Sequence, residues 1–114
     1  MQQHLSIKDI PGFPQYHADI YGNIFSSKRS GYVNTLAQSF DKDGYRITYL
    51  YDGKKKKRRV HTLVALAHVG GRTRTKCEVN HIDGDRANNA ASNLEWVSRG
   101  RNMKIMWEKR RSKK

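Results

Sequence analysis

The 114-residue sequence is poor in cysteine, acidic residues and long apolar runs, and each shortage excludes a class of protein. A single cysteine, Cys77, rules out an internal disulfide and a paired-cysteine zinc knuckle, so we expect no zinc and a reducing, cytoplasmic setting. The longest apolar run covers residues 63–67, far short of the roughly 20 residues of a membrane helix. Residues 1–4 are polar where a signal peptide needs a basic flank and an apolar stretch. We therefore expect no membrane association.

Positive charge is the strongest signal of the composition. Lysine and arginine number 23 against 10 aspartate and glutamate, which gives a net charge of +13 and a pI near 10.2. A small domain with this balance attracts polyanions, chiefly nucleic acid. Charge alone also permits a small RNA-binding protein of the ribosomal type, but that alternative does not explain the pattern of residues 79–102.

Residues 79–102 predict a short strand, a polar loop, a second strand and a helix. Residues 79–82 and 94–97 are apolar and β-branched or aromatic, and the loop between them begins with a turn signal at residues 83–84. Ser98 is suited to cap the helix, because its hydroxyl can accept a hydrogen bond from a backbone N–H of the first turn. Asn102 then lies about one turn into the helix.

Three residues of this stretch stand out by their spacing: His81, Asn93 and Asn102. If the strands form a hairpin and the helix folds back across it, His81 and Asn102 face one small cleft. Hydrolysis of a phosphodiester needs a base to take a proton from water and a hard cation to hold the phosphate oxygens. A neutral histidine suits the first task, and asparagine oxygens suit the second.

The stretch resembles the HNH (ββα-metal) endonucleases, in particular the small HNH homing endonucleases of bacteriophages. The resemblance is carried by Asn80-His81-Ile82-Asp83-Gly84-Asp85, Asn88-Asn89, Ser92-Asn93-Leu94-Glu95-Trp96-Val97 and Asn102. It implies a DNA endonuclease with His81 as general base, Asn93 holding the loop, and one Mg²⁺ or Mn²⁺ ion at Asn80 and Asn102. Asp83 and Asp85 are interpreted as turn residues, with Asp85 as a reserve ligand.

Asn80 departs from the family pattern, which often has aspartate or histidine at this position. An amide brings no negative charge, so the alternative is a non-catalytic DNA-binding protein that keeps the HNH fold. With one cleft, a monomer is expected to nick double-stranded DNA, whereas cutting of both strands requires a homodimer or two successive events.

The N-terminal half predicts an antiparallel β-meander followed by a short helix, so that the whole chain is of the α+β class. Strands are expected on either side of a turn within residues 16–26, and then over residues 36–40, 45–51 and 58–60, with a helix over residues 61–69. This half resembles the nuclease-associated modular motif, through Ile10-Pro11-Gly12-Phe13, Tyr21-Gly22-Asn23-Ile24, Asp43-Gly44-Tyr45 and Val60-His61-x-Leu63-Val64-Ala65. The predicted division is residues 1–71, a DNA-binding module, and residues 72–114, the nuclease motif with a basic tail.

Basic residues are the candidates for contact with DNA phosphates. Lys54 to Arg59 follow a turn at residues 52–53 on an expected hairpin. Six consecutive cations usually form a solvated tip, but phosphate contact is the favoured interpretation in so basic a protein. Arg46 and Thr48 alternate along a strand that could reach a groove. Met103, Met106 and Trp107 are expected to pack on the hairpin. The full set of predicted nucleic-acid-binding residues is Lys28, Arg29, Arg46, Lys54, Lys55, Lys56, Lys57, Arg58, Arg59, Arg72, Arg74, Arg99 and Arg101.

Overall fold

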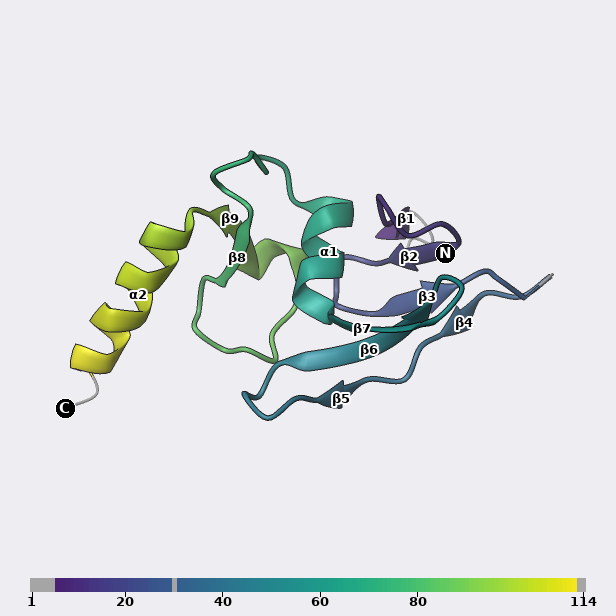
Figure 1. The fold of residues 1–114 in the computed structure, drawn as a ribbon, viewed down its shortest axis with the longest axis horizontal. Helices are drawn as coiled ribbons and strands as arrows, with labels where there is room; N and C mark the ends of the chain where they lie inside the picture. The colour runs from purple at the N-terminus through teal and green to yellow at the C-terminus, as the bar shows by residue number, and fades with distance from the viewer. Residues whose placement is uncertain (1–5, 30, 113–114) are drawn as a thin grey trace.

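The computed structural model describes residues 6–29 and 31–112, and within them the chain forms an α+β fold of three antiparallel sheets with two α-helices (Figure 1). The first sheet contains β1 (Lys8–Asp9), β2 (Tyr16–Ala18), β3 (Ile24–Ser26) and β4 (Asn34–Thr35). The second contains β5 (Ser39–Phe40), β6 (Arg46–Tyr51) and β7 (Lys55–Arg59). Helix α1 (Val60–His68) leads to a hairpin of β8 (Glu78–His81) and β9 (Leu94–Val97). A short 3₁₀ turn, η2 (Ala91–Asn93), precedes β9, and helix α2 (Arg99–Ser112) follows the hairpin.

The turn between β2 and β3 is organised by a buried carboxylate. Asp19 accepts hydrogen bonds from the backbone N–H groups of Tyr21 and Asn23, both at 2.9 Å, and from the Asn23 side-chain amide at 2.8 Å. Gly22 has a positive φ of 103° in this turn, a conformation that residues with a Cβ rarely adopt. The predicted pair of strands around residues 22–23 is therefore confirmed.

The basic run of residues 54–59 lies on the predicted hairpin, but its strand begins earlier than the predicted residues 58–60. Lys55 to Arg59 form β7, and the tip is the turn before it, where Gly53 has a φ of 74°. Strand β7 pairs with β6 in an antiparallel register that sets Lys57 opposite Tyr49. Repulsion within the run is tolerated because alternate side chains of a strand point to opposite faces.

Of the predicted strand over residues 36–40, only residues 39–40 form a strand, because the chain crosses before them from the first sheet to the second. Leu36 donates its backbone N–H to Ile24 at 2.8 Å, whereas Ala37 accepts a bond of 2.9 Å from the Thr48 hydroxyl. Thr48 is only 1% exposed and cannot reach a DNA groove. The expectation for this residue was wrong, since its hydroxyl joins two segments of the protein interior.

Helix α1 supplies the centre of the core. Val60, Leu63, Val64 and Ala65 are fully buried and cluster with residues from both halves of the chain: Ile10, Tyr16, Ala18, Ile24, Leu50, Leu94 and Trp96. The Trp96 indole N–H also donates to the carbonyl of Val69 at 2.9 Å. Burial of each large aliphatic side chain stabilises the fold by about 1.5–3 kcal/mol. One cluster thus fixes β9 against the N-terminal sheets, and the division near residue 71 stays a prediction.

Helix α2 begins as predicted and then projects from the body of the protein (Figure 1). The Ser98 hydroxyl accepts a hydrogen bond from the backbone N–H of Arg101 at 3.2 Å. Met103 and Trp107 are 50% and 58% exposed, so the expectation that they pack on the hairpin was wrong. Both line a pocket on α2 itself, together with Gly100, Lys104 and Glu108. Over the described residues, no helix combines the length and apolar character required to cross a bilayer.

Candidate active site

His81 lies at the end of β8, opposite Leu94 of β9, and is only 6% exposed. Its Nε2 atom is 2.8 Å from the side-chain oxygen of Asn89. A neutral His81 that donates from Nε2 to this oxygen has its Nδ1 atom unprotonated. The sequence had indicated Asn89 only as a loop residue.

Two aromatic side chains pack around the His81 imidazole. The ring of His61, from α1, meets it edge to face with centroids 4.8 Å apart, and the Tyr45 ring lies 6.0 Å away. Burial lowers the pKa of His61 to about 3, and the neighbouring His81 and Arg59 charges add to this effect. His61 is therefore neutral at physiological pH and places a neutral ring beside His81.

Both predicted metal ligands are oriented by glutamates that the sequence patterns did not single out. The Asn80 amide nitrogen donates to the Glu95 carboxylate at 2.8 Å, and the Asn102 amide nitrogen donates to the Glu78 carboxylate at 3.1 Å. Because each amide gives its nitrogen to a carboxylate, each amide oxygen is left for another partner. Two half-buried carboxylates thereby bring negative charge next to the neutral ligands. Asn80 and Glu95 are direct cross-strand partners, so the alternation of the predicted hairpin could have indicated this pair.

Asn93 ties the loop between the strands to the end of β8. Its side-chain oxygen accepts the backbone N–H of Asp83 at 3.0 Å, and its amide nitrogen donates to the Asp83 carboxylate and to the carbonyl of Asn88, both at 2.9 Å. The hydrogen bond from Asn88 is the main cause that lowers the pKa of Asp83, followed by that from the Asp85 backbone. Asp83 and Asp85 both cap turns of the loop through their carboxylates.

These elements enclose a cleft of about 490 Å³ between the hairpin, α2 and the loop. His81, Asn80 and Asn102 all line it, as do Asp85 and a residue that the sequence patterns did not single out, Arg86. The remaining lining residues are Tyr45, Val79, Gly84, Ile105 and Met106. Within the described part of the chain, no group of three or more histidine, cysteine, aspartate and glutamate side chains could hold a metal ion. The two amide oxygens nevertheless fit Mg²⁺ or Mn²⁺, because hard cations accept oxygen donors and complete their shells with water and phosphate.

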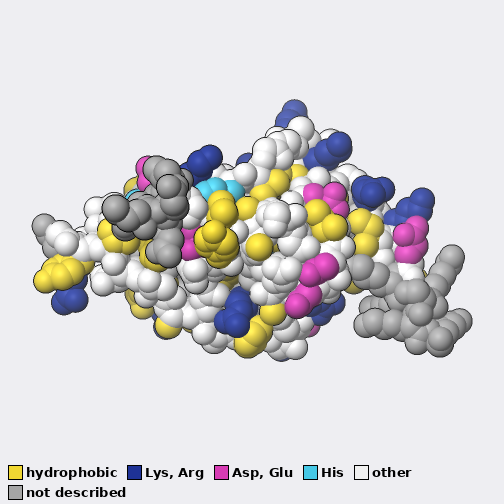
Figure 2. All heavy atoms as spheres, turned by 180° about the vertical axis from the view of Figure 1, so that it is seen from behind, with side chains coloured by type: hydrophobic (Ala, Val, Ile, Leu, Met, Phe, Trp, Pro, Cys, Tyr) yellow, Lys and Arg dark blue, Asp and Glu magenta, His cyan; other side chains and the backbone are white. Residues whose placement is uncertain are grey.

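The predicted DNA-contacting residues differ in how far they are exposed and in whether they already form ion pairs. Arg59 forms ion pairs of 3.1 Å with Asp41 and 3.5 Å with Asp43, which leaves it less free for a phosphate. On the face drawn in Figure 2, Lys and Arg side chains follow the outline of the molecule rather than one compact patch. The exposed residues are Lys28, Arg29, Lys54, Lys55, Lys57, Arg59, Arg72, Arg74, Arg99 and Arg101, and the half-buried ones are Arg46, Lys56 and Arg58.

A hairpin followed by a helix, with histidine and asparagine side chains facing one cleft, is the arrangement of an HNH nuclease domain. Residues 58–104 match the family model described as HNH endonuclease. Residues 58–104 of the chain belong to the HNH endonuclease family.

Particular relatives extend the likeness beyond that domain. The chain is 40% identical over 93 residues to DNA endonuclease I-HmuI of Bacillus phage SP01, covering 80% of this chain and 51% of the relative. It is 39% identical over 103 residues to an uncharacterized HNH endonuclease of Acanthamoeba polyphaga mimivirus, covering 84% of this chain and 24% of that protein. A solved structure of I-HmuI, an HNH homing endonuclease that binds and cleaves DNA, matches with a TM-score of 0.77 and 33% identity over 90% of this chain and 58% of that one. The chain thus spans about a quarter to a half of the length of these sequence relatives.

Proposed function

We propose that this protein is a divalent-metal-dependent DNA endonuclease that nicks double-stranded DNA, with His81 as its general base. The observation that carries the proposal is the cleft that His81, Asn80 and Asn102 line together, with His81 Nε2 2.8 Å from the Asn89 side-chain oxygen. Similarity to I-HmuI, which binds and cleaves DNA, supports the choice of substrate.

In the proposed reaction, His81 removes a proton from the attacking water. Nδ1 takes the proton while the water oxygen bonds to phosphorus, and the bond from phosphorus to the 3′ oxygen breaks. The products are a 5′-phosphate and a 3′-hydroxyl, the latter completed by a proton from solvent. His81 becomes a cation during this step, and the Asn89 oxygen stabilises the Nε2–H group that carries part of the charge.

HNH nucleases use a divalent metal, and the oxygens of Asn80 and Asn102 would hold one ion here. A Mg²⁺ or Mn²⁺ ion so bound would stabilise negative charge on the phosphate and on the leaving oxygen. Glu95 and Glu78 orient the two amides, and their charges offset the lack of a carboxylate at Asn80. Asn93 positions His81 indirectly, because its backbone oxygen accepts the N–H of Ile82 at 2.8 Å.

The net charge of +13 supplies the attraction to the DNA backbone. Contacts to phosphates fix position without selecting a base sequence, and they make affinity fall with salt. A cleft with one general base hydrolyses one phosphodiester at a time, so a monomer nicks and a homodimer is needed for cutting both strands together.

The test is conversion of supercoiled plasmid to open-circle or linear DNA with Mg²⁺, with Mn²⁺ or with EDTA. We expect the native protein to produce open circles only with metal and His81→Ala to lose at least 100-fold in rate, the lower part of the range for a general base. A matched control is His17→Gln, since His17 bonds to Asp9 and Ser27 and does not line the cleft. If native protein binds the plasmid yet neither metal supports cutting, the non-catalytic alternative replaces the proposal.

A further inference from the structure

Arg86 is the positively charged side chain of the His81 cleft. It lies on the loop between β8 and β9, and it lines the cleft together with Asn80 and Asn102. The lining residues that the structure describes include no other lysine or arginine, and they include one carboxylate, that of Asp85. A phosphodiester that enters this cleft therefore meets Arg86 as the one lysine or arginine among these residues.

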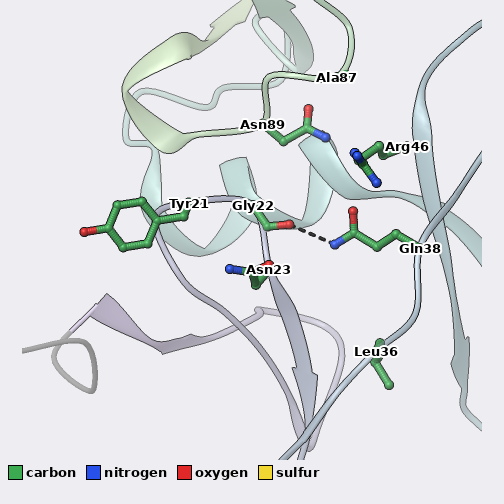
Figure 3. Close-up of a pocket in the computed structure, with 8 residues that line it drawn as sticks. All are labelled: Tyr21, Gly22, Asn23, Leu36, Gln38, Arg46, Ala87 and Asn89. Carbon is green, nitrogen blue, oxygen red and sulfur yellow. Dashed lines mark hydrogen bonds between the residues drawn. The ribbon is translucent and has the colours of Figure 1, made fainter. Parts of the chain in front are cut away.

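Another basic residue near this loop, Arg46, belongs to a different pocket. Arg46 lines a pocket of about 440 Å³ together with Gln38, Ala87 and Asn89 (Figure 3). That pocket shares no lining residue with the cleft. Arg86 and Ala87 are neighbours in the chain, yet they line different pockets. Arg46 therefore does not supply positive charge to the lining of the cleft.

Two contacts from the turn before β6 hold the exposed Arg86 side chain. One guanidinium nitrogen, Nη1, donates a hydrogen bond to the backbone carbonyl of Asp43 at 2.5 Å. The central carbon of the guanidinium lies 4.9 Å from the centroid of the Tyr45 ring, and Tyr45 itself lines the cleft. A guanidinium has several N–H donors, so the hydrogen bond to Asp43 leaves those on Nε and Nη2 for a ligand.

The charge of Arg86 is not neutralised by a carboxylate of the described residues, with none of which it forms an ion pair. Arg59 lies over the same Tyr45 ring, with its central carbon 4.0 Å from the centroid. It takes the two carboxylates of the turn, 3.1 Å from Asp41 and 3.5 Å from Asp43. The two arginines thus share one aromatic ring, but only Arg59 is paired. A fixed and unpaired guanidinium is the group that recognises a phosphate best.

Negative charge around the cleft makes a protein cation necessary there. The carboxylates of Glu95 and Glu78 accept hydrogen bonds from Asn80 and Asn102, which line the cleft. A phosphodiester brings one further negative charge, and it gains another when the deprotonated water bonds to phosphorus. A positive group that is held in place before the reaction stabilises such developing charge most effectively, because it does not have to reorganise.

We propose that Arg86 binds the phosphate that is hydrolysed and stabilises its negative charge in the transition state. Its free N–H groups donate hydrogen bonds to a non-bridging oxygen of that phosphate. The Asp43 carbonyl and the Tyr45 ring hold the guanidinium for this task, so that the turn before β6 completes the active site of the HNH domain. This inference rests on the proposed function, because it takes the DNA phosphate in the cleft as the ligand.

Binding without chemistry tests the contact first. Affinity for a short DNA duplex is measured in EDTA at several salt concentrations. We expect Arg86→Gln to bind about 3- to 10-fold more weakly, with a salt slope smaller by about 0.9, the value for one phosphate contact. Arg86→Lys keeps the charge and should keep the native slope. The matched control is Lys42→Gln, since Lys42 is exposed in the same turn as Asp43 but does not line the cleft. Equal losses in Arg86→Gln and Lys42→Gln would indicate general attraction and overturn the proposal.

A duplex with one uncharged methylphosphonate identifies the phosphate that Arg86 contacts. The position that native protein cuts is determined from its products, and the methylphosphonate is placed there or, in a control duplex, several base pairs away. At the cut position it should weaken binding in EDTA by native protein, but change binding by Arg86→Gln by no more than about twofold, because the variant has already lost the contact. Equal weakening for both proteins would overturn the proposal, since a merely structural Arg86 does not depend on the charge of one phosphate.

Single-turnover cleavage at saturating protein measures the catalytic part of the proposal. We expect Arg86→Gln to cut at least about 100-fold more slowly than native protein, the lower part of the range for one donor to a transition state. Arg86→Lys should fall between the two, because lysine lacks the planar fork of arginine. If native protein cuts with metal and Arg86→Gln binds and cuts as native protein does, this inference fails and the proposed function stands. If native protein never cuts but the salt slope of Arg86→Gln falls, the proposed function and the catalytic role fail, and the phosphate contact stands.

Discussion

Replacing Asn80 by aspartate tests whether a carboxylate at this position destabilises the protein without metal and strengthens metal binding. The side-chain nitrogen of Asn80 lies 2.8 Å from a Glu95 oxygen and donates a hydrogen bond to it. Asn80→Asp removes the donor and sets two carboxylates against each other in a place where Asn80 is 8% exposed. The variant gains a negative charge that attracts a metal cation, but it loses the hydrogen bond to Glu95 that orients the side chain at position 80.

The cost without metal follows from the hydrogen bond and the repulsion. A hydrogen bond to a charged group contributes about 1.5–3 kcal/mol, and two like charges 4 Å apart repel by as much as about 4 kcal/mol at an effective dielectric constant near 20. Because Glu95 is half-buried and can turn toward water, we expect a net loss of about 2 kcal/mol. For a chain of this size that lowers Tm by roughly 8 °C.

Thermal unfolding in EDTA and in Mn²⁺ or Mg²⁺ measures the effect. Metal should raise the Tm of Asn80→Asp more than that of the native protein, with about 2.7 kcal/mol recovered when the metal is at 100 times its Kd. Asn80→Asp combined with Glu95→Gln restores the hydrogen bond with donor and acceptor exchanged, so its stability in EDTA should return to near the native value. Glu95→Gln alone keeps an acceptor and is the matched control. Equal Tm in EDTA for native protein and Asn80→Asp would refute the reasoning.

Two further predictions concern residues around His81. The pKa of His61 is about 3 in the folded protein and near 6.5 in the unfolded chain. Between these pH values the unfolded chain therefore binds one more proton than the folded protein. The free energy of unfolding consequently falls as the pH drops from about 6.5 toward 3. His61→Leu should remove up to about 1.4 kcal/mol per pH unit of this slope, as urea unfolding between pH 4 and 7 can measure; an unchanged slope would contradict it. Gly22→Ala should cost at least about 1 kcal/mol more than Gly12→Ala in the same assay, because both have positive φ but only the Cβ at Gly22 meets Asn89, 3.2 Å away.

Local patterns sufficed for most of the secondary structure. The hairpin of residues 78–97, the Ser98 cap and the helix after residue 59 follow from alternation, turn residues and apolar spacing within short windows. The strand predicted over residues 58–60 was too short, because a run of lysines gives no strand signal and only its pairing with β6 makes residues 55–59 a strand. The basic tail was also predicted, but the side chains from residue 109 onward lie outside the described residues.

The sequence predicted the residues of the candidate site but not the side chains that form hydrogen bonds with them. His81 and Asn102 line one cleft, as their spacing indicated, and Asn80, which the resemblance implied, lines it too. Their orienting partners Asn89, Glu95 and Glu78 were not predicted, although all three are near neighbours in the hairpin or its loop. Which end of an amide meets which neighbour depends on side-chain direction, and spacing along the chain does not give it.

The sequence by itself determined the order of strands, loop and helix, the basic charge, and the histidine and asparagines of an HNH motif. These features depend on composition and on short sequence segments, so they can be predicted without knowledge of the tertiary contacts. Tertiary structure alone decided that His61 and Tyr45, far away along the chain, close around His81, and that the Asn89 side chain lies within hydrogen-bond distance of the same ring. Such contacts form because the shared core on α1 brings distant segments together, and only that packing fixes the chemistry of each atom.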